Sequence, residues 1–297
     1  MTSPNNMPVC VANVGALCGE SPVWDPRRQV LHWVDITRET VHTYDPATRT
    51  NTTIQLPYLV SAVLLMENPE SLIAATARGL ARLDLVTAKL DLLHDPEPEL
   101  PGNRLNDCKA DPRGRIFAGT MSEGAKGPTG SLWSYNGLAP QKLVSGLTIS
   151  NGLGWSPDGR RFYLVDSPKG KIFAFTYDPD NGALSNQTTL AHYSPENGKP
   201  DGLCVDQAGN LWVAFWDGAR VEQLSPRGEV LQQVPLPVQR PTSCCFGGPD
   251  LKQLYITSAA FGIEAPDLDG GLFTLDVEIA GLPSTPVRSG TVALPEQ

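Results

Sequence analysis

Short apolar runs alternate with turn residues along almost the whole chain, a pattern typical of an all-β protein. The clearest example lies at residues 111–121, where the turn Asp-Pro-Arg-Gly is followed by the apolar run Ile116, Phe117 and Ala118. This eleven-residue pattern predicts a tight turn and a strand, as in a β-hairpin. It recurs along the chain, so that the six copies start at Asp25, Met66, Asp111, Ser156, Asp206 and Gly248.

The spacing of these copies indicates the architecture. Successive copies start 41, 45, 45, 50 and 42 residues apart, which is the period of a four-stranded propeller blade. We therefore predict a single six-bladed β-propeller domain over residues 1–297. The last repeat supplies only three strands, whereas residues 8–14 form an additional apolar run before the first repeat. We expect this N-terminal strand to complete the last blade, which would leave the ring without a free edge.

A polar residue stands five positions before each copy and begins a short apolar run. We call these six residues the ring residues: Glu20, Ser61, Asn106, Asn151, Asp201 and Ser243. Equivalent positions on six innermost strands would surround the propeller axis. Two carboxylates, two carboxamides and two hydroxyls facing a channel would suit a cation or a polar ligand, although such side chains could also simply meet channel water.

Two more candidates lie close to Asn106. Arg104 precedes it by two residues, so both side chains would face the same side of an extended segment and grip a polyhydroxylated or carbonyl-bearing ligand. Arg104 could instead pair with a loop carboxylate, and Glu123 could line the channel mouth or be solvated. Asn151 and Asp201 each precede a glycine, and each alone would indicate a turn. Only their shared position in the repeats suggests a site.

The net charge and the distribution of apolar residues disfavour several kinds of binding partner. A net charge of -9 disfavours nucleic acid and anionic membranes, and no stretch approaches the roughly 20 apolar residues of a membrane helix. The first residues lack the basic region of a secretory leader. We therefore expect a cytoplasmic monomer or weak homo-oligomer, with its six cysteines as reduced thiols.

Cys244 and Cys245 would point to opposite faces of a strand. The four histidines show no spacing typical of zinc ligands.

Five stretches carry a resemblance to a known family. They read GESPVWD, NRLNDCKADPRGRIFAGTM, SNGLGWSPDGRRFYLVD, PDGLCVDQAGNLWVAFWDG and TSCCFGGPDLKQLYITSA. Together they resemble the senescence marker protein (regucalcin), gluconolactonase and luciferin-regenerating family of six-bladed propellers, in family order over nearly the whole chain. Two positions depart from the family pattern: Cys108 replaces a usual Gly, and Gly124 replaces an acidic residue that some members have. The second departure concerns contacts to the sugar.

The resemblance implies one divalent cation held by Glu20, Asn151 and Asp201, with Arg104 and Asn106 contacting the substrate. Such an oxygen ligand set suits Ca, Mg or Mn, and Zn and Fe(II) also accept it. The implied activity is that of a metal-dependent lactonase of carbohydrate metabolism, which hydrolyses an aldonolactone such as gluconolactone, xylonolactone or arabinonolactone to the open aldonate. The cation would polarise the lactone carbonyl and acidify water, and Asp201 would orient or deprotonate that water.

Two other functions remain open from the sequence. One is a metal-dependent phosphotriesterase on a related propeller, which would need a more apolar pocket than Arg104 and Asn106 suggest. The other is a non-catalytic calcium-binding propeller. These alternatives differ in whether lactone is consumed and in whether the bound ion keeps an exchangeable water.

Overall fold

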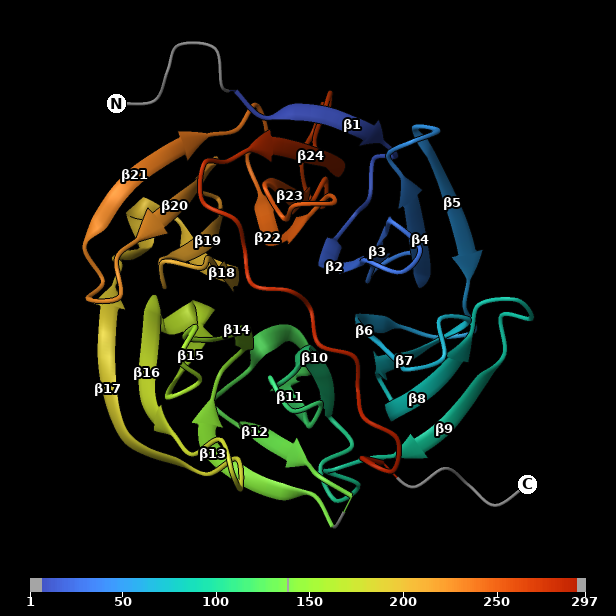
Figure 1. The fold of residues 1–297 in the computed structure, drawn as a ribbon, viewed down its shortest axis with the longest axis vertical. Coiled ribbons are helices and arrows are strands. Elements are labelled where there is room, and N and C mark those ends of the chain that lie inside the picture. Colours follow the sequence, from blue (N-terminus) through green and yellow to red (C-terminus); the bar gives the residue numbers. More distant parts are fainter. Residues whose placement is uncertain (1–6, 138, 293–297) are drawn as a thin grey trace.

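Six four-stranded antiparallel sheets surround a central axis in the computed structural model, which describes residues 7–137 and 139–292 (Figure 1). This arrangement confirms the predicted six-bladed propeller. In each of the first five blades the strands follow one another in sequence, from the innermost strand to the outermost.

Four strands make up each blade, in order from the channel to the surface. Blade 1 contains β2 (Gly19–Asp25), β3 (Val30–Asp35), β4 (Thr40–Asp45) and β5 (Thr50–Gln55), and blade 2 contains β6 (Val60–Leu65), β7 (Ser71–Thr76), β8 (Gly79–Asp84) and β9 (Leu90–His94). Blade 3 contains β10 (Asn103–Ala110), β11 (Ile116–Ser122), β12 (Gly130–Tyr135) and β13 (Gln141–Leu147), and blade 4 contains β14 (Ser150–Trp155), β15 (Arg161–Asp166), β16 (Lys171–Tyr177) and β17 (Leu184–His192). Blade 5 contains β18 (Lys199–Val205), β19 (Leu211–Trp216), β20 (Arg220–Leu224) and β21 (Val230–Pro235), and blade 6 contains β22 (Pro241–Gly247), β23 (Gln253–Ser258), β24 (Gly271–Asp276) and β1 (Val9–Asn13).

Helix is confined to three short 3-10 turns within the described ranges: η1 (Glu123–Ala125), η2 (Ser167–Lys169) and η3 (Pro195–Asn197). No helix in residues 7–137 and 139–292 has the length and apolar character needed to cross a membrane.

The sixth blade combines strands from both ends of the chain. Its outermost strand is β1, which pairs antiparallel with β24 so that Val9 lies opposite Thr274 and Asn13 lies opposite Gly271. Val11 and Ala12 of β1, and Val14 just after it, pack against the buried cluster that contains Trp24, Tyr255 and Leu272. The N-terminal strand therefore contributes both a ladder of hydrogen bonds and apolar contacts to this blade.

Apolar side chains from neighbouring blades fill the space between the sheets. Between blades 3 and 4, for example, Phe117 packs edge-on against Trp155, with ring centroids 5.2 Å apart, and also contacts Phe162. Large aromatic side chains that are removed from water in this way supply much of the stabilisation of a fold. The blades are thus joined mainly by packing between sheets.

The predicted turn of the third repeat has the expected chemistry. The backbone N–H groups of Arg113 and Arg115 donate to the carboxylate of Asp111, at 2.8 and 2.9 Å. Gly114 has a φ of 79°, in the left-handed region that favours glycine. The Asp-Pro-Arg-Gly sequence therefore closes the β10–β11 hairpin by a local mechanism.

The chain after β24 crosses one end of the channel, as the red trace through the centre of Figure 1 shows. Its backbone N–H groups donate to three different blades: Leu282 to the carbonyl of Val205, Val287 to that of Leu65, and Arg288 to that of Gly114. This C-terminal segment therefore links blades 2, 3 and 5 across one end of the channel.

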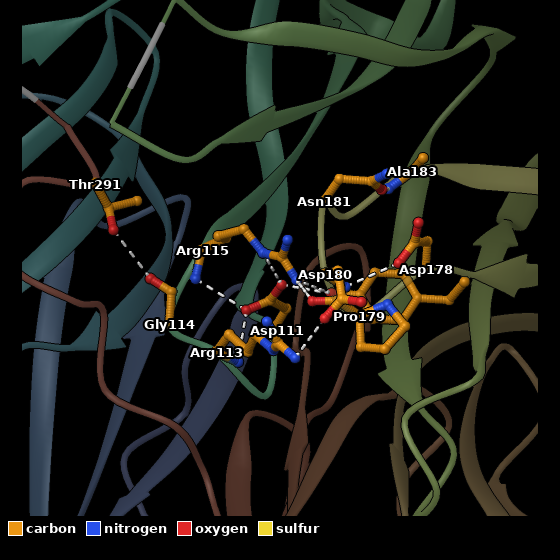
Figure 2. A network of polar contacts seen from close by, with 11 residues as sticks. Asp111, Arg113, Gly114, Arg115, Asp178, Pro179, Asp180, Asn181, Ala183 and Thr291 are labelled. Atoms are coloured by element: carbon orange, nitrogen blue, oxygen red, sulfur yellow. Dashed lines mark hydrogen bonds and ion pairs between the residues drawn. The ribbon is translucent and has the colours of Figure 1, made fainter.

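A buried polar network joins blades 3 and 4 (Figure 2). The side chains of Asp111 and Arg115 form an ion pair and are 0% and 7% exposed. Arg115 also donates to the Tyr177 hydroxyl and to the Pro179 carbonyl, each at 2.7 Å, and the Tyr177 hydroxyl donates to Asp111. Because the side chains of Asp111, Arg115 and Tyr177 are buried, removing one of the three would leave its partners unsatisfied.

Tyr177→Phe is expected to lower the free energy of unfolding by roughly 1–2 kcal/mol, because Asp111 loses a donor and Arg115 loses an acceptor. Urea unfolding followed by fluorescence would measure this. The matched control is Asp180→Ala, which removes an exposed partner of Arg113 in the same network and should change stability by less than about 0.5 kcal/mol. Equal effects of both variants would contradict a stabilising role for the buried hydroxyl.

Candidate functional site

The structure places all six ring residues on the innermost strands β2, β6, β10, β14, β18 and β22. Their exposed fractions lie between 3% and 9%. Each innermost strand shifts register against the second strand of its blade at or beside this position. Such bulges redirect side chains and are frequent beside functional sites. A repeated backbone irregularity therefore coincides with the repeated polar position.

Direct hydrogen bonds link the ring residues of blades 2, 3 and 4. The Ser61 hydroxyl donates to the Asn106 carbonyl at 2.9 Å, and Asn106 Nδ2 donates to Asn151 Oδ1 at 2.7 Å. Asn151 Nδ2 in turn donates to the Ser167 hydroxyl at 2.9 Å. These contacts fix the orientation of the Asn151 amide, whose oxygen has a second lone pair available for another ligand.

Electrostatics connects Glu20 and Asp201 with a third carboxyl group, Asp107. Burial raises the pKa of Glu20 from 4.5 to about 8, and the charge of Asp107 adds to this rise. Burial also raises the pKa of Asp201, with further contributions from Glu20 and Asp107. Three carboxyl groups thus lie close enough to repel one another in a poorly solvated space.

Asp201 has an unsatisfied atom, since its buried Oδ1 finds no hydrogen-bond partner among the described residues. A buried acceptor without a partner costs free energy. An oxygen-binding cation would satisfy this atom and offset the repulsion between the carboxylates. Glu20, Asn151 and Asp201 therefore fit a divalent cation, and all three offer oxygen, the donor that Ca, Mg and Mn prefer.

This candidate set differs from the usual clusters of acidic, histidine or cysteine ligands. Within residues 7–137 and 139–292, no three or more His, Cys, Asp and Glu side chains are grouped so that they could hold a metal ion. The candidate set contains two carboxylates and one asparagine, so its proposed third ligand is a neutral amide oxygen. The role of these residues as cation ligands stays a prediction.

Arg104 lies beside Asn106, as the two-residue spacing predicts. Arg104 Nη1 donates to Asn106 Oδ1 at 2.9 Å and to the Leu105 carbonyl at 2.8 Å. No ion pair of Arg104 is found in the described part of the chain. Glu123 lies on the exposed turn η1, and its charge acts on the Arg104 guanidinium. Whether Arg104, Asn106 and Glu123 contact substrate stays a prediction.

The repeat pattern predicts no role for Asp107, which follows the ring residue Asn106. Strict alternation along an extended strand would direct it away from Asn106, but the register of β10 shifts between Leu105 and Cys108. The Asp107 carboxylate accepts backbone hydrogen bonds from Cys108 and Leu153 and influences the pKa of Glu20 and of Asp201. The sequence signal is an acidic residue next to Asn106 on the innermost strand of its blade.

Without a divalent cation, stability is expected to fall as the pH rises from 6.5 to 8. In this window folded Glu20 keeps a proton that the unfolded chain has released, so the slope can reach about 1.4 kcal/mol per pH unit for each such carboxyl group. Below pH 6.5 the lowered pKa values of His32 and His42, about 4 each, act in the opposite direction. Melting curves of chelator-treated protein would measure the slope.

The matched variant for this pH dependence is Glu20→Gln, which cannot titrate at this position and should reduce the slope, leaving the contribution of Asp201. Adding a divalent cation should raise the melting temperature of the unmodified protein more at pH 8 than at pH 6.5, because the cation binds the ionised carboxylates. A melting temperature of the chelated protein that is constant or rises over this window would contradict the prediction.

Comparison with known proteins places the chain in a family. The family model described as "SMP-30/Gluconolactonase/LRE-like region" matches residues 18–260. Regucalcin of Xenopus laevis is 37% identical over 86% of this chain and 87% of its own length. The Bacillus subtilis (strain 168) protein named "Putative sugar lactone lactonase YvrE" is 34% identical over 94% of this chain and 97% of its own.

A solved structure also matches the whole fold. The crystal structure of a calcium-binding protein, regucalcin, from Agrobacterium tumefaciens str. C58 superposes with a TM-score of 0.91 at 27% identity, covering 95% of this chain and 98% of that one. Sequence and fold thus agree over nearly the full length. The chain belongs to the SMP-30/gluconolactonase/LRE-like family.

Proposed function

We propose that this protein is a divalent-cation-dependent lactonase that hydrolyses a sugar-acid lactone to the open aldonate. Family membership and the name of the Bacillus subtilis relative support lactone hydrolysis. The observation that carries the proposal is the buried, unpartnered Oδ1 of Asp201, which lies near the carboxyl group of Glu20 where burial disfavours both charges. Such a site is incomplete without a positive charge.

Glu20, Asn151 and Asp201 would hold the cation. The hydrogen bond from Asn106 keeps the Asn151 oxygen in place, and the Ser21 N–H donates to Glu20 Oε2 at 2.9 Å, which orients that carboxylate. A bound divalent cation would supply a Lewis acid that polarises the lactone carbonyl and acidifies water. The oxygen donors leave the choice among Ca, Mg, Mn, Zn and Fe(II) open, and the calcium-binding Agrobacterium relative favours testing Ca first.

Side chains around this site would activate the attacking water and bind the lactone. Asp201 would orient the attacking water and accept its proton, which general-base catalysis requires within hydrogen-bond reach of the water. Arg104 would donate to the hydroxyl and carbonyl oxygens of the lactone. Asn106, whose Oδ1 accepts from Arg104 at 2.9 Å, would accept from a sugar hydroxyl with the remaining lone pair of that oxygen. Glu123, on the exposed turn beside them, would accept from a sugar hydroxyl. This arrangement would favour a polyhydroxylated substrate over an apolar ester.

The experiment measures acid release from aldonolactones in weak buffer. Protein stripped by a chelator would be resupplied with Ca, Mg, Mn, Zn or Fe(II), one at a time, and offered gluconolactone, xylonolactone and arabinonolactone. We expect at least one cation to restore acid release above the spontaneous rate. Glu20→Gln should abolish this restoration, whereas Asp180→Asn, which alters an exposed carboxylate in the turn between the outer strands β16 and β17, should retain it.

A second candidate function is a calcium-binding propeller without turnover, which the description of the Agrobacterium relative favours. The same samples distinguish the two functions. A cation that binds, as measured by calorimetry, while every lactone is hydrolysed only at the spontaneous rate would reject the lactonase. Hydrolysis of a phosphotriester included in the panel, without lactone hydrolysis, would instead identify a phosphotriesterase.

A further inference from the structure

Two buried cysteines from different blades face each other beside the channel. Cys204 lies on β18 and Cys244 lies on β22, and their Sγ atoms are 3.6 Å apart. All six cysteines are free thiols in the structure. A separation of 3.6 Å is a contact between unbonded sulfurs, since a disulfide bond measures about 2.05 Å. The two thiols are thus neighbours without being linked.

The two strands approach each other closely at this level. A Cβ atom added to Gly202 would lie only 2.0 Å from the Ser243 hydroxyl oxygen. Gly202 and Ser243 lie two residues and one residue before the paired cysteines, so the close approach of β18 and β22 is not limited to the sulfur atoms. Cys204 and Cys244 also share one buried cluster, whereas Cys245 belongs to a different one. This confirms that Cys244 and Cys245 point to opposite faces.

A cavity gives small molecules a route to these thiols. It has a volume of about 550 Å³ and is lined by Cys204, Cys244, Lys109 and the part of the C-terminal segment at residues 282–285. Cys204 is 7% exposed and Cys244 is 1% exposed. Lys109 donates to the Leu203 carbonyl at 2.9 Å, and its charge favours the thiolate form of Cys204. Of these two neighbouring thiols, Cys204 is therefore the one that a small oxidant in the cavity would meet first.

We propose that Cys204 and Cys244 form an oxidation site, at which hydrogen peroxide oxidises the two thiols to a disulfide bond that links blades 5 and 6. The Cys204 thiolate attacks one peroxide oxygen, the O–O bond breaks, and the leaving hydroxide takes a proton to become water. The resulting Cys204 sulfenic acid is attacked by the Cys244 sulfur, which forms the S–S bond and releases the second water. Two electrons pass from the thiols to one hydrogen peroxide, and the products are one disulfide and two waters.

The burial of the pair determines how fast it reacts. Burial raises the pKa of the Cys204 thiol well above its ordinary value, and the neighbouring Cys244 adds to this rise. Because the thiolate is the reactive form, oxidation should be slow at neutral pH and should accelerate about tenfold per pH unit between pH 7 and pH 9. The disulfide bond would therefore form during sustained exposure to an oxidant and would not form during a brief pulse.

The test exposes the folded, full-length protein to hydrogen peroxide and counts thiols after denaturation. We expect a loss of two of the six thiols, and peptide mapping without reductant should find Cys204 joined to Cys244. Cys108→Ser serves as the matched control, because Cys108 lines the same cavity from β10 but belongs to a different buried cluster; this variant should still lose two thiols. Cys244→Ser should stop the reaction at the Cys204 sulfenic acid, which dimedone would trap.

Several results would overturn the proposal. They are retention of all six thiols at pH 9, a disulfide between any other pair, and an equal loss of all thiols. If Cys244→Ser does not fold, peptide mapping of the unmodified protein decides alone. The outcome is independent of lactonase activity, because thiol counts and mapped peptides require neither substrate nor cation.

Discussion

Asp201→Asn is expected to lower kcat/KM for an aldonolactone by about a thousandfold, roughly 4 kcal/mol of transition-state stabilisation. The variant keeps the size of the side chain but removes a charge from the proposed cation site and removes the proposed base. Loss of a general base alone typically costs a factor of about 100 to 10,000. Acid release at saturating cation would measure turnover, and calorimetry would measure cation affinity separately.

The matched control for Asp201→Asn is Ser243→Ala, a change at another buried ring position that carries no charge and is assigned no ligand role. It should keep activity within about threefold. Near-normal turnover of Asp201→Asn would reject Asp201 as the base. Full recovery of turnover at higher cation concentration would limit Asp201 to a role as a ligand.

Deleting residues 1–14 is expected to lower the melting temperature by roughly 10 °C or more. The deletion removes β1, uncovers the edge of β24, and exposes the cluster around Trp24 and Tyr255 against which Val11 and Ala12 pack. Calorimetry or circular dichroism would measure the change. Because an uncovered edge promotes association between chains, light scattering should be recorded alongside.

The control for this deletion is Val9→Thr, which alters a 60% exposed side chain on the same strand and keeps the ladder. Its melting temperature should stay within about 1 °C of the unmodified protein. A truncated protein that melts at the temperature of the full-length chain would show that β1 contributes little to the stability of the sixth blade.

Much of the fold could be predicted because its determinants are local. The turn at Asp111 depends on a carboxylate that accepts from N–H groups a few residues away and on a glycine with positive φ at Gly114. Repetition of such turns every 41 to 50 residues reveals the number of blades. The same count places Glu20, Asn151 and Asp201 at equivalent positions, although they are far apart in the chain.

Features that depend on closure of the ring could not be predicted in this way. The register shift in β10 makes the position of Asp107 differ from simple alternation. The Asn151 amide is held by Ser167 on η2, an element that no pattern predicted. Similarly, the meeting of Cys204 and Cys244 depends on how closely β18 and β22 approach.

The sequence by itself determined the propeller, the number of its blades and the six ring positions, because turn chemistry and apolar alternation act over a few residues and repeat. Only the tertiary structure decided that Glu20, Asp107 and Asp201 share one poorly solvated space, and that Asp201 Oδ1 is left without a partner among the described residues. The physical reason is that desolvation and repulsion between charges depend on distances between residues that closure of the ring brings together.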